Sequence, residues 1–188
     1  VSYLTEELVA MGHDVTLFAS GDSITSAKLT PICQQALRLN PAIVDPLPYA
    51  LLMMKEVRRR AREFDILHFH IDQLHFPLFT GHANRTLTTL HGRQDLPDLQ
   101  ALYRGFPEMP LISISLAQRK PIPDGNFAGN VLHGIPAGLL PLNLHPRGGY
   151  LAFLGRVSEE KGVDRAIAIA KAVGMPLKIA AKVDRKEV

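Results

Sequence analysis

The sequence predicts an α/β protein whose parallel sheets are flanked by helices. Short apolar runs alternate with segments of helical period along most of the chain, as parallel sheets with crossover helices require. Proline and glycine gather near residue 140, and a further strand, turn and helix follow them. With 188 residues, 46% hydrophobic and 21% charged, the chain can bury a substantial core in one large domain or two small ones.

The predicted elements begin with a helix. Apolar residues recur at helical spacing over residues 1–11, and Gly12 stands where a left-handed residue would end that helix. An apolar run at residues 14–19 predicts the first strand. The same reasoning predicts a helix over 49–63, a strand over 66–70, a short helix over 76–82, and strands over 86–90, 111–115 and 129–132.

The stretch from residue 135 to 149 predicts an extended connection between domains. It contains Pro136, Pro141, Pro146 and three glycines, a composition that favours turns over helix or strand. We therefore predict a first domain over residues 1–141, a linker over 142–149 and the start of a second domain over 150–188.

Residues 154–162, with the sequence Leu-Gly-Arg-Val-Ser-Glu-Glu-Lys-Gly, form the most distinctive segment. The apolar run before it predicts a buried strand, and the apolar spacing after it predicts a helix that ends near Gly174. A helix start at the end of a strand offers unpaired N–H groups and a partial positive charge. Arg156 and Lys161 add two full charges, so this turn predicts a site for an anion such as a diphosphate.

This segment resembles the retaining glycosyltransferases of family 4, also known as glycosyl transferase group 1, whose second domain opens with a strand, Gly-Arg and Glu-Lys-Gly before a helix. Residues 12–19, 65–70 and 89–92 are similar to earlier segments of the same family, in the same order. The resemblance implies the GT-B fold, which has two Rossmann-like domains with the active site between them. The first domain would bind the acceptor and the second the nucleotide-sugar.

The same resemblance implies that the sequence is incomplete at both ends. Family members usually begin with a strand and a glycine-rich loop ahead of the helix that opens this chain. Their second domain carries two glutamates eight residues apart, a spacing that does not occur here. We therefore expect the 188-residue chain alone to be inactive, and the full-length protein to be a hexosyltransferase.

The implied reaction moves a sugar from a nucleoside-diphosphate sugar, such as a UDP-sugar, to a hydroxyl of a carbohydrate, lipid or small-molecule acceptor, with retention at the anomeric carbon. No cofactor and no metal would be required beyond the donor substrate. The resemblance assigns a catalytic role facing the donor sugar to His91, and donor diphosphate binding to Arg156 and Lys161. Possible contacts in the active-site cleft are Gly92, Ser115 and Lys182.

Other interpretations of these residues stay open at this point. Arg156 could cap the sheet edge while Lys161 pairs with a neighbouring glutamate, and His91 could be structural. A GT-B-like nucleotide-sugar epimerase would share the cations but would also need an acid and a base against the sugar ring. A fragment without catalytic activity is the remaining alternative.

Histidines and serines near the predicted strand ends have competing interpretations. His68, His70 and His75 suggest a metal site, but zinc requires three or four converging ligands, so we expect no metal there. Ser113 and Ser115 could meet an acceptor, although capping of the following helix is the more common role of such serines.

Composition favours a cytoplasmic protein without nucleic acid partners. The formal net charge is only +3, and a single cysteine, Cys33, cannot form an internal disulfide. No apolar run approaches the roughly 18 to 20 residues that a membrane helix needs, and the first residues lack the basic start of a signal peptide. The basic run at residues 58–62 predicts a solvated helix face, with weak contact to anionic lipid at the inner membrane surface as the alternative.

Overall fold

The computed structural model describes residues 1–145 and 148–183 of the chain. Contacts within the chain divide it into two units, Val1–Leu139 and Leu140–Val188. The division falls two residues before the end of the predicted first domain, and Pro146 of the predicted linker lies outside the described residues. The assignment of the units to acceptor and donor stays a prediction.

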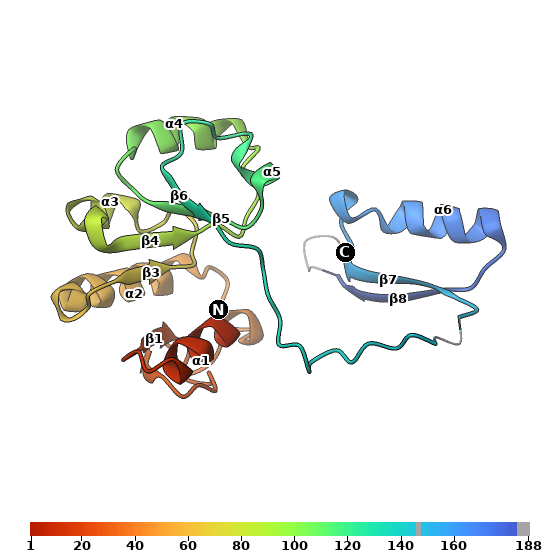
Figure 1. Ribbon diagram of the computed structural model, residues 1–188, viewed down its shortest axis with the longest axis horizontal. Helices are drawn as coiled ribbons and strands as arrows, with labels where there is room; N and C mark the ends of the chain where they lie inside the picture. Colours follow the sequence, from red (N-terminus) through yellow and green to blue (C-terminus); the bar gives the residue numbers. More distant parts are fainter. Residues whose placement is uncertain (146–147, 184–188) are drawn as a thin grey trace. The chain divides into compact units, whose positions relative to one another are not determined.

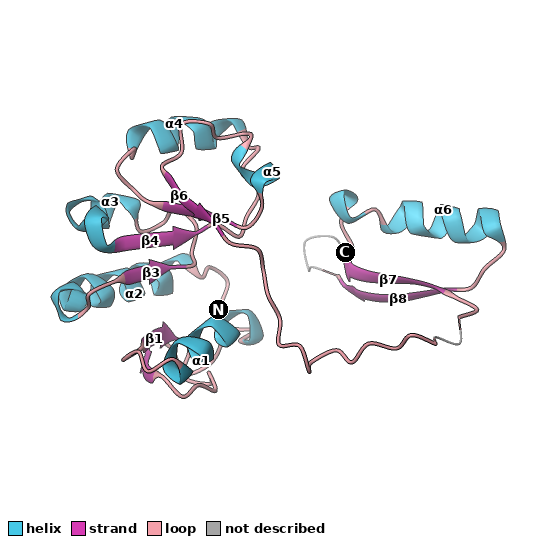
Figure 2. Ribbon diagram, in the orientation of Figure 1, coloured by secondary structure: helices cyan, strands magenta, loops and turns pink. Residues whose placement is uncertain are grey.

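The first unit alternates strands and helices (Figures 1 and 2). In chain order its α-helices and strands are α1 (Ser2–Ala10), β1 (Thr16–Ala19), β2 (Lys28–Pro31), α2 (Leu47–Arg60), β3 (Leu67–Phe69), α3 (Phe76–Phe79), β4 (Thr86–Thr89), α4 (Pro97–Gly105), β5 (Leu111–Ser113), α5 (Leu116–Arg119) and β6 (Phe127–Asn130). Short 3-10 helices lie at η1 (Leu37–Leu39), η2 (Ala61–Glu63) and η3 (Thr80–Arg85).

These strands form two parallel sheets. One contains β1 and β2, and the other has the order β3-β4-β5-β6. In a parallel sheet the carboxyl ends of all strands lie along one edge, and the loops that follow them meet there. The predicted α/β class with parallel sheets flanked by helices is confirmed.

The core of the first unit lies between the larger sheet and its helices. Met54, Val57 and Ala61 follow one another at helical spacing and are buried, as expected of a helix that packs one apolar side on a sheet. From α3, Phe76 and Phe79 are fully buried among the side chains of Phe69 and Tyr103. Burying each such aromatic ring contributes about 2 kcal/mol, so this cluster holds the strand ends at fixed positions.

Three elements differ from the prediction. The last strand of the first unit spans Phe127–Asn130, which is two residues earlier than predicted at each end. The sequence pattern did not reveal β2, because Lys28 and Pro31 interrupt its apolar signal. It also missed α4, in which Pro97 occupies the first turn and Tyr103 is buried.

The second unit contains β7 (Leu151–Arg156), the 3-10 turn η4 (Glu159–Lys161), α6 (Val163–Val173) and β8 (Leu177–Lys182). The two strands are parallel neighbours. Gly162 and Gly174 have φ of 68° and 65°, so left-handed glycines bound α6 on both sides, the second as predicted. No helix in the described parts of either unit is long and apolar enough to cross a membrane.

Candidate functional site

Four imidazoles gather at the carboxyl ends of β3 and β4 and in the segment after β6, and we call this group the histidine edge: His68, His70, His91 and His133. Nδ1 of His70 lies 2.9 Å from Nε2 of His91, so one ring donates a hydrogen bond to the other. The ring of His133 is stacked on that of His91, with 5.3 Å between centroids and 5° between planes. His91 therefore has two imidazole partners: His70 is hydrogen-bonded to its Nε2, and His133 is stacked on its ring face.

The surroundings favour the neutral form of His68, His70 and His91 by lowering the pKa of each. Burial lowers the pKa of His70 to about 3, with His68 and His91 as further causes. Burial also lowers the pKa of His91, followed by the nearby His133, while Asp72 acts in the opposite direction. A neutral imidazole offers one donor and one acceptor nitrogen, which suits hydrogen bonding to sugar hydroxyls.

Asp72 joins the loop after β3 to the loop after β4. Its Oδ1 accepts hydrogen bonds from the backbone N–H groups of His91, at 3.2 Å, and Gly92, at 3.3 Å. Asp72 has a φ of 51°, the only positive value among described residues other than glycine. A Cβ added at Gly92 would lie 3.2 Å from Asp72 Oδ2, so glycine permits this close approach.

Two glutamine side chains hold the same loop from the other side. Nε2 of Gln94 and Nε2 of Gln118 each donate to the carbonyl oxygen of Gly92, both at 3.1 Å. Gln94 is buried and accepts a hydrogen bond from the hydroxyl of Tyr103. Gly92 is thus fixed through its own N–H and C=O groups, and its contact in the active-site cleft stays a prediction.

The predicted serines take structural positions. Oγ of Ser115 accepts a hydrogen bond from the N–H of Gln118 at 3.1 Å and caps α5, as the more common role predicts. Ser113 is buried and bonded to Asn130 and Arg119. Both hydroxyls form hydrogen bonds within the first unit. A cleft contact by Ser115 stays a prediction.

The histidines that suggested a metal separate into different environments. His75 is fully buried, stacks on Phe69 and bonds Thr88 Oγ1 at 2.9 Å, while His68 bonds Thr89 Oγ1 at 2.8 Å. His68 lies within the strand predicted over residues 66–70, and it is exposed between the buried Leu67 and Phe69. Over residues 1–145 and 148–183, no three His, Cys, Asp or Glu side chains are arranged to hold a metal ion.

The second unit places cations at the carboxyl ends of its two strands. Arg156 ends β7 and is the register partner of Lys182, which ends β8. Register partners in a sheet project from the same face, so the side chains of Arg156 and Lys182 leave the sheet from neighbouring positions on one face. The stem of Lys161 passes near Gly155, where an added Cβ would lie 3.9 Å from Lys161 Cγ.

Glu160 partly neutralises the positive charge of Arg156. Its Oε1 lies 3.3 Å from an Arg156 guanidinium nitrogen, and both side chains are about half exposed, at 55% for Arg156 and 43% for Glu160. The backbone N–H of Glu160 itself and the nearby Ser158 side chain lower the pKa of Glu160, and Arg156 adds to the shift. Exposed ion pairs of this kind add little to stability, so an anionic ligand can displace the carboxylate at low cost.

The tertiary structure thus brings together some predicted residues and adds others. His91 and Gly92 lie on one loop, and Arg156 lies beside Lys182. Asp72 was expected with His70 at the end of its strand near the cleft, with metal binding as the alternative, and Gln94 was not singled out, although both fix the loop of His91. The sequence signal that could have identified these two residues is that each is a polar residue in the loop that follows a predicted strand.

Comparison with known proteins identifies one family. A family model described as Glycosyltransferase Family 4 matches residues 1–119. That range contains β1 to β5, α5 and the part of the histidine edge formed by His68, His70 and His91. No curated protein matches the chain significantly.

Proposed function

This chain belongs to Glycosyltransferase Family 4, and from that premise we propose that it acts in the transfer of a sugar from a nucleoside-diphosphate sugar to an acceptor hydroxyl, with retention of the anomeric configuration. The observation that carries the proposal is the neutral, exposed and doubly held imidazole of His91 inside the matched region. Ligands of open α/β sheets bind at the carboxyl ends of the strands, where His91 lies.

His91 is the proposed catalytic residue. Positive charge develops at the anomeric carbon as the leaving group departs, and a neutral imidazole can hydrogen-bond a sugar hydroxyl or orient its dipole there without accepting a proton. His70 and Asp72 fix the ring and the backbone of His91, so its position is set before the substrate binds. This preorganisation favours the transition state over the ground state.

Arg156 and Lys161 are the proposed diphosphate ligands, with Lys182 beside Arg156. The departing nucleoside diphosphate gains negative charge, and fixed guanidinium and ammonium groups stabilise such charge without a metal. The N-terminus of α6 adds a partial positive charge a few residues further along the chain. Removing one such donor from a preorganised anion site typically costs about 3 kcal/mol of transition-state stabilisation.

The test is kinetic and uses the protein at full length. Purified protein is incubated with a panel of nucleoside-diphosphate sugars and hydroxyl acceptors, and the anomeric configuration of the product is read by NMR. His91→Ala should lower kcat about a hundredfold, the scale of losing one oriented polar group, with a smaller change in donor KM. His13→Ala, an exposed histidine outside the histidine edge, is the matched control.

Thermal melting of the same variants separates catalysis from folding. We expect His91→Ala to melt close to the parent protein, because His91 is exposed. Parental kcat in His91→Ala, or a product of inverted configuration, would contradict the proposal.

A further inference from the structure

Three imidazoles of the histidine edge come from the ends of three different strands. His70 follows β3, His91 comes after β4 and His133 comes after β6. In the sheet order β3-β4-β5-β6, β3 is the neighbour of β4, whereas β5 lies between β4 and β6. Two strand spacings are roughly 9.6 Å, so the stack of His133 on His91 crosses the end of β5.

The backbone on both sides of this stack is held by β5. One residue before His91, the N–H of Leu90 donates to a carbonyl oxygen of β5 at 3.0 Å. Two residues before His133, the N–H of Val131 donates to another carbonyl oxygen of β5 at 2.9 Å. Because the same strand anchors both segments, the two rings are brought together by the register of the sheet.

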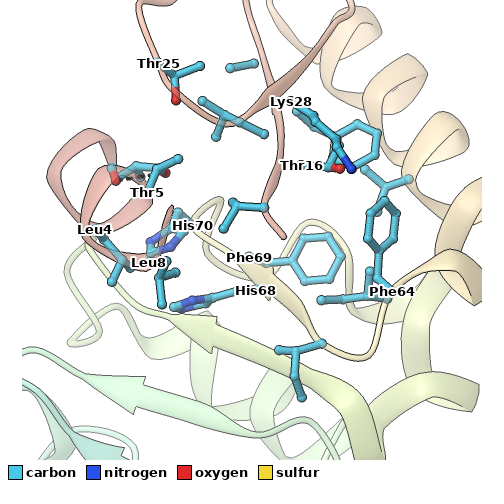
Figure 3. Close-up of a pocket in the computed structure, with 18 of the residues that line it drawn as sticks. Leu4, Thr5, Leu8, Thr16, Thr25, Lys28, Phe64, His68, Phe69 and His70 are labelled. Atoms are coloured by element: carbon cyan, nitrogen blue, oxygen red, sulfur yellow. Dashed lines mark hydrogen bonds between the residues drawn. The ribbon is translucent and has the colours of Figure 1, made fainter. Parts of the chain in front are cut away.

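His70 holds the His91 ring at a nitrogen, and His70 is itself held in place. Figure 3 shows His68 and His70 side by side at the end of β3, with 4.2 Å between their ring centroids. Nε2 of His68 lies 2.8 Å from Oγ1 of Thr89, which fixes the outer ring of the pair. The hydrogen bond from His70 to His91 therefore comes from a ring that is packed on a fixed neighbour.

These contacts decide which atom of His91 a ligand can meet. The hydrogen bond with His70 occupies Nε2, and His133 covers one face of the ring. Nδ1 of His91 forms no hydrogen bond with any described residue, and His91 is exposed. Burial lowers the pKa of His91 and His133 lowers it further, so the ring that covers His91 also favours its neutral form.

We propose that His133 is a positioning residue for His91: its ring, stacked across the end of β5, holds the His91 imidazole against His70 so that Nδ1 is the nitrogen presented to the substrate. This inference rests on the proposed function of His91, and it adds the residue that orients the ring and the atom that acts. Without the stack, the ring can turn among about six combinations of χ1 and χ2, of which one keeps Nε2 on His70.

Turnover of the full-length protein measures the loss of position. His133→Ala should lower kcat about three- to sixfold, because the productive orientation becomes one of about six, with little change in donor KM. His133→Phe keeps an aromatic ring for the stack and should retain most of the parental kcat. Leu132→Ala, at a neighbouring side chain that is 70% exposed, is the matched control and should leave kcat unchanged. His133 is exposed, so all three variants should melt close to the parent.

Alkylation by bromoacetate at neutral pH identifies the presented nitrogen without depending on activity. A ring nitrogen attacks the CH₂ group of the reagent, a C–N bond forms, bromide leaves and the ring proton passes to the buffer. Mass spectrometry locates the modified histidine, and chromatography after hydrolysis separates the Nδ1 from the Nε2 product. His91 of the parent chain should give the Nδ1 product. His133→Ala and His70→Ala should each add the Nε2 product, whereas His133→Phe should react as the parent does.

The two measurements separate this inference from the proposed function. If His91→Ala loses turnover while His133→Ala keeps the parental kcat and product ratio, the proposed function stands and the positioning role is wrong. If the product ratio shifts in His133→Ala while His91→Ala keeps the parental kcat, the orientation of the ring by His133 is supported and the proposed function is wrong. Reaction of the parent at Nε2, no reaction of His91, or a phenylalanine variant that behaves like alanine also overturns the proposal.

Discussion

Substitution of Asp72 tests how the loop of His91 is held, and the structure allows three variants to be ranked. Asp72→Ala removes the acceptor for the N–H groups of His91 and Gly92. A net hydrogen bond contributes about 1 kcal/mol in a protein, and water replaces part of it at an accessible loop. Aspartate tolerates the left-handed φ of 51° better than alanine does, and this difference adds less than about 1 kcal/mol. We expect Asp72→Ala to lower the free energy of unfolding by about 1 to 2 kcal/mol.

Two companion variants separate these contributions. Asp72→Gly loses the same hydrogen bonds but tolerates the left-handed backbone, so its loss should be about 1 kcal/mol smaller than that of alanine. Asp72→Asn keeps one acceptor oxygen and tolerates the same backbone conformation, so it should be the mildest of the three.

Urea unfolding of the three proteins measures the ranking, and hydrogen exchange at His91 and Gly92 reports the loop itself. Both amides should exchange faster in the alanine and glycine variants and remain protected in the asparagine variant. If the Asp72→Gly protein is less stable than the Asp72→Ala protein, backbone strain at position 72 does not contribute to the loss. If the amides of His91 and Gly92 exchange equally in all variants, Asp72 does not hold the loop.

Three further outcomes are expected. In the full-length protein, Arg156→Ala and Lys161→Ala should each lower turnover about a hundredfold, whereas Lys171→Ala near the end of α6 should not; parental donor kinetics in both variants would refute the diphosphate assignment. Burial lowers the pKa of His75 to about 3, so the unfolded chain binds a proton that the native chain does not, and stability should fall as pH drops from about 6.5 toward 3. His75→Phe should show a shallower fall by thermal melting, and an unchanged slope would count against this. Limited proteolysis should cut first between residues 135 and 149, whose described residues are mostly exposed, and mass spectrometry of the first fragments would expose a different order.

Local pattern predicted the elements that carry their own signal. The helix face of Met54, Val57 and Ala61, the existence of a strand before the Gly-Arg turn and the glycine that ends α6 all follow from short-range spacing and backbone preference. The family resemblance carried by residues 12–19, 65–70 and 89–92 lies in the region that the family model matches. By contrast, β2 and α4 were missed because their formation depends on neighbours that the local sequence does not show.

The sequence by itself determined the α/β class, the family and the residue types available for chemistry, because hydrophobic period and motif order are properties of neighbouring residues. The tertiary structure alone decided that His70, His91 and His133 meet, although 21 and 42 residues separate them in turn. It also decided that Asp72 holds the loop of His91. These arrangements depend on strand order and register, which long-range packing sets and which no local pattern of residues encodes.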